Sequence, residues 1–232
     1  MNQLDLDVQS LNKYFSKLAP EEIIKECIKK FGKKITYICS FGTESAIILD
    51  MIAKINKNFP IFLLNTNFLF PETIAYKEEL LRKLKLTNCI DIFPEKRLLD
   101  KEDPNDDLWT RNTDRCCELR KVLPLENKLI GMKAWISGRK SIHKGQREKL
   151  QVFEALNNKV VVNPLVNITK QQVNNYFKEN NLPEHPLFKL GYLSIGCIHC
   201  TFKPTNLEDP RSGRWKNDTK TECGIHLTKK RD

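Results

Sequence analysis

Short apolar runs alternate with longer amphipathic segments along most of the chain. Strand-length runs occupy residues 35–40 (ITYICS), 60–65 (PIFLLN) and 88–93 (NCIDIF). Between them, residues 46–55 and 71–86 show the spacing of apolar residues that is typical of a helix. Because parallel strands need a crossover connection, usually a helix, this alternation predicts an α/β fold with a doubly wound, mostly parallel sheet.

The remaining elements continue the alternation. The first helix is predicted over 20–31, and Pro71 is expected in the first turn of its helix. A helix around 116–130 precedes the strand KAWIS, and the runs QVFEA and KVVVNPLV predict two more strands. Thr169 is a suitable N-cap for the helix that follows. The acidic stretch 100–107 is expected to be a surface loop.

Three polar loops, SFGTES, NTNFLFPET and SGRKS, directly follow predicted strands. Doubly wound sheets bind ligands at the carboxyl ends of their strands, so these loops are candidates for a binding site. From about Leu190 the periodicity is lost. We therefore predict an α/β domain over 1–189 and an irregular C-terminal segment over 190–232 that folds over the site.

Positive charge is concentrated in the second half of the chain. Residues 1–115 carry 18 Lys and Arg against 18 Asp and Glu, whereas residues 116–232 carry 21 against 11. Such an excess suits an anionic partner, either nucleic acid, which composition alone slightly favours, or a small phosphate or sulfate ester. We see neither an 18-residue apolar run nor an export signal, and therefore expect a cytoplasmic protein without membrane association.

The eight cysteines fall into three groups. Cys27 lies on an apolar helix face, Cys39 within a strand and Cys89 at the start of a strand. Free cysteine commonly packs as a small hydrophobic residue. We therefore predict that these three cysteines belong to the core.

Two cysteine pairs form the second group: Cys116–Cys117, and Cys197 with Cys200. Four thiols in polar, turn-forming surroundings are enough for one metal centre. Thiolate tetrads bind zinc or an iron–sulfur cluster, and the residues by themselves leave both metals open.

Cys223 stands alone in the segment KTECGIH, where exposure is expected near the end of the chain. Lys220 and His226 flank it, and a nearby cation favours the thiolate, which is the nucleophilic form. An incidental surface cysteine is the alternative interpretation. Since no second cysteine is close in sequence, a covalent adduct on Cys223 would have to be resolved by an external thiol.

Together these segments resemble the assimilatory adenylyl-sulfate and phosphoadenylyl-sulfate reductases, in particular the branch with paired cysteines. The resemblance runs from Ser40 to Leu227 and rests most specifically on the cysteine pairs combined with ECGIH. The segments that carry it are SFGTESAIILD, PETIAYKEEL, DRCCELRKVLPL, AWISGRK, VNPLVNIT, HPLFKLGYLSIGCIHCT, DPRSGRW and KTECGIHL.

The resemblance implies an adenine-nucleotide α-hydrolase-like fold and reduction of adenosine 5′-phosphosulfate to sulfite and AMP in sulfate assimilation. It implies Cys223 as the nucleophile, with His226 in a supporting role, and thioredoxin or a glutaredoxin-like protein as reductant. The implied cofactor is a [4Fe-4S] cluster, and the implied ligands are Cys116, Cys117, Cys197 and Cys200. The implied substrate contacts are Ser40, Leu69, Lys121, Gly138, Arg147, Arg211 and Arg214.

Several alternatives remain. The 3′-phosphorylated substrate is one of them, and Lys140 and Lys144 near the expected nucleotide loop would suit this bulkier anion. An ATP pyrophosphatase such as a tRNA-thiolating enzyme is disfavoured, because SFGTES has a single glycine to open its backbone to pyrophosphate. A zinc-stabilised nucleic-acid-binding module would explain neither Cys223 nor the strand-end loops, and we expect no nucleic-acid partner. The sequence leaves homo-oligomer formation open.

Overall fold

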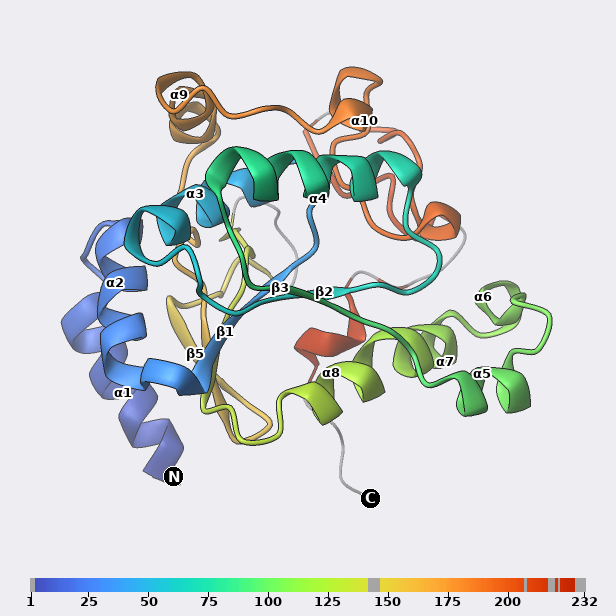
Figure 1. The fold of residues 1–232 in the computed structure, drawn as a ribbon, viewed down its shortest axis with the longest axis horizontal. Coiled ribbons are helices and arrows are strands. Elements are labelled where there is room, and N and C mark those ends of the chain that lie inside the picture. Colours follow the sequence, from blue (N-terminus) through green and yellow to red (C-terminus); the bar gives the residue numbers. More distant parts are fainter. Residues whose placement is uncertain (1–2, 142–146, 207, 217–219, 221, 228–232) are drawn as a thin grey trace.

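A central sheet organises the computed structural model, which describes residues 3–141, 147–206, 208–216, 220 and 222–227. The described residues form one six-stranded sheet in the order β3-β2-β1-β4-β6-β5. Figure 1 shows the sheet in the middle of the molecule. All neighbouring strands are parallel except β5 and β6. This confirms the predicted fold class. The strands are β1 (Ile35–Cys39), β2 (Ile61–Leu64), β3 (Cys89–Ile92), β4 (Ala134–Ile136), β5 (Phe153–Leu156) and β6 (Lys159–Val162).

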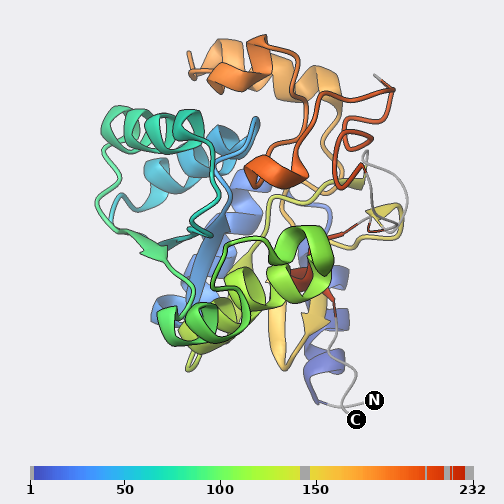
Figure 2. The same ribbon diagram turned by 90° about the vertical axis from the view of Figure 1, so that its right-hand side faces the viewer.

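Helices lie on both sides of this sheet. Figures 1 and 2 show α3 and α4 on one side and α5 to α8 on the other. The helices are α1 (Gln3–Phe15), α2 (Pro20–Phe31), α3 (Ser45–Ile55), α4 (Pro71–Leu84), α5 (Lys96–Glu102), α6 (Leu108–Arg111), α7 (Thr113–Cys117), α8 (Leu123–Lys128), α9 (Lys170–Glu179) and α10 (Pro186–Lys189). Shorter helical turns are η1 (Gly32–Lys34), the π-helical η2 (Glu118–Val122), η5 (Ile198–Cys200) and η6 (Gly224–His226).

Alternate residues of each strand supply the two halves of the core. In β2, Ile61 and Leu63 pack with α1 to α4, whereas Phe62 and Leu64 pack on the opposite face with Leu125 of α8. Successive side chains of a strand point to opposite faces, and both faces of a parallel sheet are buried. The near-continuous apolar runs in the sequence follow from this.

The structure corrects one sequence-based expectation, adds a helix that was not predicted, and confirms a predicted helix cap. The stretch 100–107 is not wholly a surface loop, because its first three residues complete α5 and Asp103 is buried at 2% exposure. Helix α1 was not predicted; its residues Val8 and Leu11 are buried in the core. The predicted N-cap of α9 is confirmed, since the Thr169 hydroxyl accepts a hydrogen bond from the N–H of Gln172.

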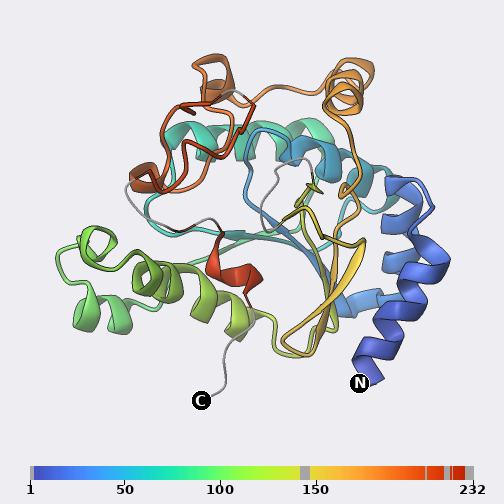
Figure 3. The ribbon, with the colours of Figure 1, turned by 180° about the vertical axis from the view of Figure 1, so that it is seen from behind.

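The chain after α9 returns to the sheet. Figure 3 shows η6 beside α8, on the same side of the sheet. Its Ile225 packs against the apolar cluster that includes Leu125 and Trp135. The division into domains 1–189 and 190–232 stays a prediction. Among the described residues, no helix combines the length and apolar character needed to cross a bilayer.

Candidate active site

A cavity of about 240 Å³ lies where β1, β2 and β4 end. The loops after these strands contribute Ser40, Leu69 and Gly138 to its wall. Parallel strands end at the same edge of the sheet, so loops far apart in sequence meet there. The structure brings all nine predicted catalytic and substrate-binding residues to this cavity. They are Ser40, Leu69, Lys121, Gly138, Arg147, Arg211, Arg214, Cys223 and His226.

The cavity wall is strongly basic. Arg139 and Lys140 join the predicted Lys121, Arg147, Arg211 and Arg214 in its lining. Lys140 is paired with Glu44. Lys144 lies outside the described residues. So many cations around one small space suit a ligand with more than one negative charge.

Arg214 is held against the backbone of the CxxC loop. Its Nε donates a hydrogen bond to the Cys200 carbonyl at 2.9 Å, and its guanidinium lies 4.5 Å from the Trp215 ring centre. A Cβ atom at Gly196 would lie only 2.3 Å from Nη2 of Arg214. Glycine at position 196 therefore makes the space that Arg214 occupies.

The four paired cysteines are buried, and the two pairs lie close enough to interact. Burial raises the pKa of Cys116 to about 11, and the charges of Cys197 and Cys200 contribute to this shift. Cys197 and Cys200 pack together with Trp215. Among the described residues, no three Cys, His, Asp or Glu side chains are arranged to hold a metal ion. Four buried thiols on two neighbouring segments nevertheless fit the donor set of a [4Fe-4S] cluster.

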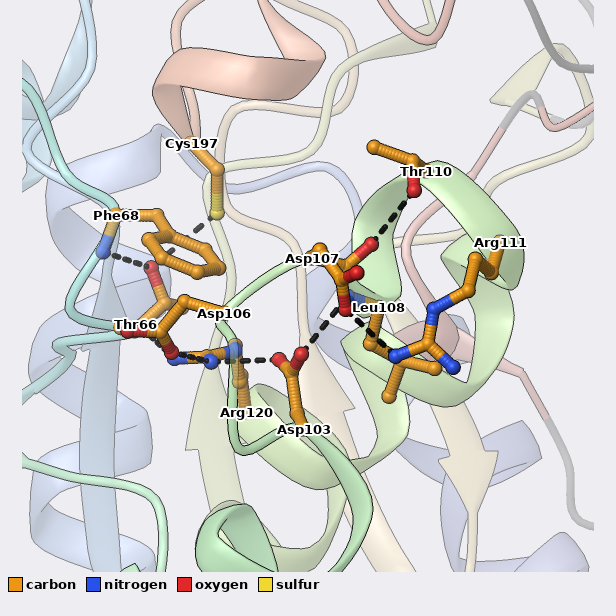
Figure 4. A network of polar contacts seen from close by, with 10 residues as sticks. All are labelled: Thr66, Phe68, Asp103, Asp106, Asp107, Leu108, Thr110, Arg111, Arg120 and Cys197. Carbon is orange, nitrogen blue, oxygen red and sulfur yellow. Dashed lines mark hydrogen bonds and ion pairs between the residues drawn. The ribbon is translucent and has the colours of Figure 1, made fainter.

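A buried ion-pair network supports this cysteine loop (Figure 4). Arg120 donates to an oxygen of Asp103 at 2.7 Å and to the Thr66 carbonyl at 3.1 Å. Thr66 Oγ1 lies 3.2 Å from Cys197 Sγ. The Arg120 guanidinium also lies 3.9 Å from the ring centre of Phe68. The network thus connects the acidic stretch after α5 with the end of β2 and the second cysteine pair.

Cys223 is half-buried, which corrects the expectation of exposure. Its thiol interacts electrostatically with the Cys117 thiol, and each affects the pKa of the other. Lys121 lies nearby: burial lowers the Lys121 pKa, but negative charge on Cys197, Cys223 and Cys117 raises it more. The segment that carries Cys223 therefore folds into the cavity between the basic residues and the first cysteine pair.

The pKa of Cys223 is well below its ordinary value in this environment. Interaction with the Cys117 thiol lowers it most, burial opposes this effect, and the charge of Lys121 lowers it further. A metal-bound Cys117 has no proton to donate, so the first of these contributions belongs to the metal-free chain. Lys220, which flanks Cys223 in sequence, pairs with Asp114.

His226 packs against the sheet rather than against the Cys223 sulfur. Its ring stacks on Trp135 with ring centres 5.3 Å apart, and its backbone N–H donates to the Cys223 carbonyl. Burial first, and then the charge of Arg139, lower the pKa of His226 well below its ordinary value. A neutral ring can orient the segment, whereas electrostatic support of a thiolate would need a protonated ring.

Sequence reasoning missed several cavity residues. Glu222, Arg139 and Trp135 line the cavity but were not among the predicted site residues. Glu222 stands directly before Cys223, and an acidic residue beside a candidate nucleophile in a basic protein is a signal that could have been followed. Trp135 is a strand residue of the core, and nothing in its sequence context distinguishes it from other buried aromatic residues.

A doubly wound sheet with a basic cavity at its carboxyl edge, lined by Cys223 and by Cys197 of the second cysteine pair, defines an α/β protein that places a thiol in an anion-binding cavity. Comparison with known proteins gives the family. The model of the phosphoadenosine phosphosulfate reductase domain matches residues 34–203, and the chain belongs to this family.

Individual relatives agree with this membership. An adenosine 5′-phosphosulfate reductase of Chelativorans sp. (strain BNC1) is 39% identical, and the match covers 97% of this chain and 93% of the relative. An adenosine 5′-phosphosulfate reductase of Mesorhizobium japonicum is 41% identical, and the match covers 94% of this chain and 86% of the relative. The crystal structure of a phosphoadenylyl-sulfate reductase from Candida auris, a phosphate complex, superposes with a TM-score of 0.71. It is 30% identical and covers 87% of this chain and 98% of that one.

Proposed function

We propose that this protein reduces adenosine 5′-phosphosulfate to sulfite and AMP in sulfate assimilation, with Cys223 as the nucleophile. One observation carries the proposal: Cys223 lies in the same cavity as Lys121, Arg211 and Arg214. A sulfate ester bound by these cations would have its sulfur within reach of a thiolate. The names of the relatives agree with this substrate.

The reaction divides into two thiol steps. The Cys223 thiolate attacks the sulfate sulfur, a sulfur–sulfur bond forms, and the sulfur–oxygen bond to the phosphate breaks with AMP as leaving group. An external dithiol then attacks the Cys223 sulfur and releases sulfite with the electron pair of the sulfur–sulfur bond. The second thiol of the donor resolves the mixed disulfide, so that two electrons leave the dithiol and Cys223 returns to its thiolate.

The basic residues have a separate role in this scheme. Arginine forks bind sulfate and phosphate oxygens through two parallel hydrogen bonds, and lysine supplies a compact charge. Lys121 lies beside Cys223 and can offset negative charge both on the thiolate and on the sulfate that it approaches. Holding both reactants in one geometry removes much of the entropic barrier to attack.

We further propose that Cys116, Cys117, Cys197 and Cys200 hold a [4Fe-4S] cluster. The support is the burial of all four thiols and the electrostatic interaction of Cys116 with the second pair. When bound, the cluster would supply a structural link between α7 and the CxxC loop and a local field near Lys121, whereas the electrons come from thiols. A thioredoxin or glutaredoxin-like donor and a cytoplasmic location complete the proposal.

Sulfite release tests the proposed activity. Anaerobically purified protein with thioredoxin as reductant should release sulfite from adenosine 5′-phosphosulfate with a higher kcat/KM than from the 3′-phosphorylated analogue. The Cys223→Ser variant should lose turnover by several orders of magnitude, because a neutral hydroxyl is a far weaker nucleophile than a thiolate. Equal or reversed substrate preference would refute the substrate assignment, and a fully active serine variant would refute the nucleophile.

A further inference from the structure

Glu222 lines the cavity and pairs with two arginines of its wall, Arg147 and Arg211. Its side chain is 6% exposed. Arg147 binds it through two hydrogen bonds, from Nε to Oε2 at 2.6 Å and from Nη2 to Oε1 at 2.8 Å. Arg211 adds a contact to Oε1 at 3.4 Å. Burial alone would raise the pKa of Glu222, but the hydrogen bonds and charge of Arg147 lower it to about 2.

The same carboxylate also binds the backbone of the nucleophile. The N–H of Cys223 donates to Glu222 Oε1 at 2.9 Å. One oxygen atom therefore joins two arginines of the cavity wall to the residue that carries the reactive sulfur. Arg147 and Arg211 reach Glu222 from segments far apart in the sequence, so the carboxylate fixes where the C-terminal segment enters the cavity.

The other side of the segment is held by apolar contacts. Ile225 packs against the cluster that includes Trp135, and a Cβ atom at Gly224 would lie 3.1 Å from a methyl group of Val122. Contacts of this kind are less directional than an ion pair, and together with the stacking of His226 on Trp135 they hold this side of the segment against the sheet. A bidentate arginine–carboxylate pair fixes an orientation as well as a position.

We infer that Glu222 is a positioning residue for the reaction: its carboxylate, clamped by Arg147 and Arg211, sets the Cys223 sulfur beside Lys121. This inference rests on the proposed function of Cys223. The competing interpretation is that Glu222 occupies the anion site and is displaced by the substrate. The two interpretations predict opposite effects on ligand binding when the charge is removed.

The test compares Glu222→Gln, which keeps the shape of the side chain and removes its charge, with Glu222→Asp, which keeps the charge. The matched control is Asp100→Asn, the same chemical change in the exposed pair of Asp100 with Lys96. The single-turnover rate of Cys223 adduct formation at saturating adenosine 5′-phosphosulfate measures how well the sulfur is positioned. The affinity for AMP measures the effect of each substitution on ligand binding. Trypsin cleavage after Lys220 reports docking of the segment without any turnover.

For Glu222→Gln we expect adduct formation to slow by about tenfold to a hundredfold, as for loss of a charge-assisted hydrogen bond. AMP affinity should change less than about threefold, and tryptic cleavage should become faster. Glu222→Asp should recover part of the rate, and Asp100→Asn should behave like the parent protein. AMP binding that tightens about tenfold in Glu222→Gln, or an unchanged adduct rate, would overturn the inference.

If the parent protein forms no Cys223 adduct, the proposed function fails instead, and the trypsin comparison still decides whether Glu222 docks the segment.

Discussion

At the scale of single residues, the environments of the cysteines separate their roles. Burial raises the pKa of Cys27 and Cys39 to about 12 and that of Cys89 to about 11, as expected for unreactive thiols. Cys27 and Cys39 are fully buried, as predicted, whereas Cys89 is partly buried against the core. Cys117 differs from them, because its pKa depends on an electrostatic interaction with Cys223. It is the residue at which the proposed cluster and the proposed nucleophile meet.

Iron content tests the proposed ligand set at this scale. Anaerobically purified protein should contain about four irons per chain, the content of one cubane cluster. Replacing Cys117 or Cys197 by serine should remove most of this iron, whereas Cys89→Ala, a control outside the tetrad, should retain it. Iron and acid-labile sulfide are measured on each variant. Zinc in place of iron in the parent protein, or full iron content in Cys117→Ser, would contradict the ligand assignment.

At the scale of elements, the helical stretch from α7 to α8 places functional groups on two sides. The paired cysteines end α7, and the π-helical turn η2 follows them directly. Within η2, Arg120 is buried with Asp103, whereas Lys121 lines the cavity. Single π-helical turns inside α-helices often occur at functional sites. Two adjacent basic residues thus have different roles, one in the buried network and one in the cavity.

The Arg120–Asp103 pair should contribute strongly to stability. Arg120→Met would leave the fully buried Asp103 without its cation, and loss of one partner of a buried pair costs about 3–5 kcal/mol. Arg111→Met, in the exposed pair of Arg111 with Asp107, should cost at most about 1 kcal/mol. Urea unfolding of the two variants measures the difference. If the Arg120→Met variant is as stable as Arg111→Met, the buried network of Arg120, Asp103 and Thr66 does not stabilise the loop that carries Cys197.

Local patterns predicted the sheet well, because its strands are buried on both faces and bounded by turn residues. The strands β1 to β3 and the helix α2 lie where apolar runs and periodicity indicated. The burial of Asp103 could not be predicted in this way, since it depends on an arginine 17 positions further along the chain. Helix α1 was missed because its sequence opens with the alternation LDLDV, which is not the apolar spacing of a helix. In the structure Val8 and Leu11 are buried, and Leu4 and Phe15 pack against the core.

At the scale of the whole molecule, the fold gathers the site from distant parts of the sequence. The strand-end loops contribute Ser40 and Gly138, the helical stretch contributes Lys121, and the C-terminal segment contributes Arg211 and Cys223. Sequence reasoning identified these residues through the family resemblance and through the rule that ligands bind at the carboxyl ends of strands. The contact of Glu222 with Arg147 is a long-range pairing that only the folded chain reveals.

The most direct test of the account is to trap the intermediate on the nucleophile. Incubating the protein with adenosine 5′-phosphosulfate in the absence of any thiol should add the mass of one SO₃ per chain. Peptide mapping should place the added group on Cys223, and addition of thioredoxin should discharge it as sulfite. An adduct on another cysteine, or sulfite release that proceeds without any modification of Cys223, would contradict the account.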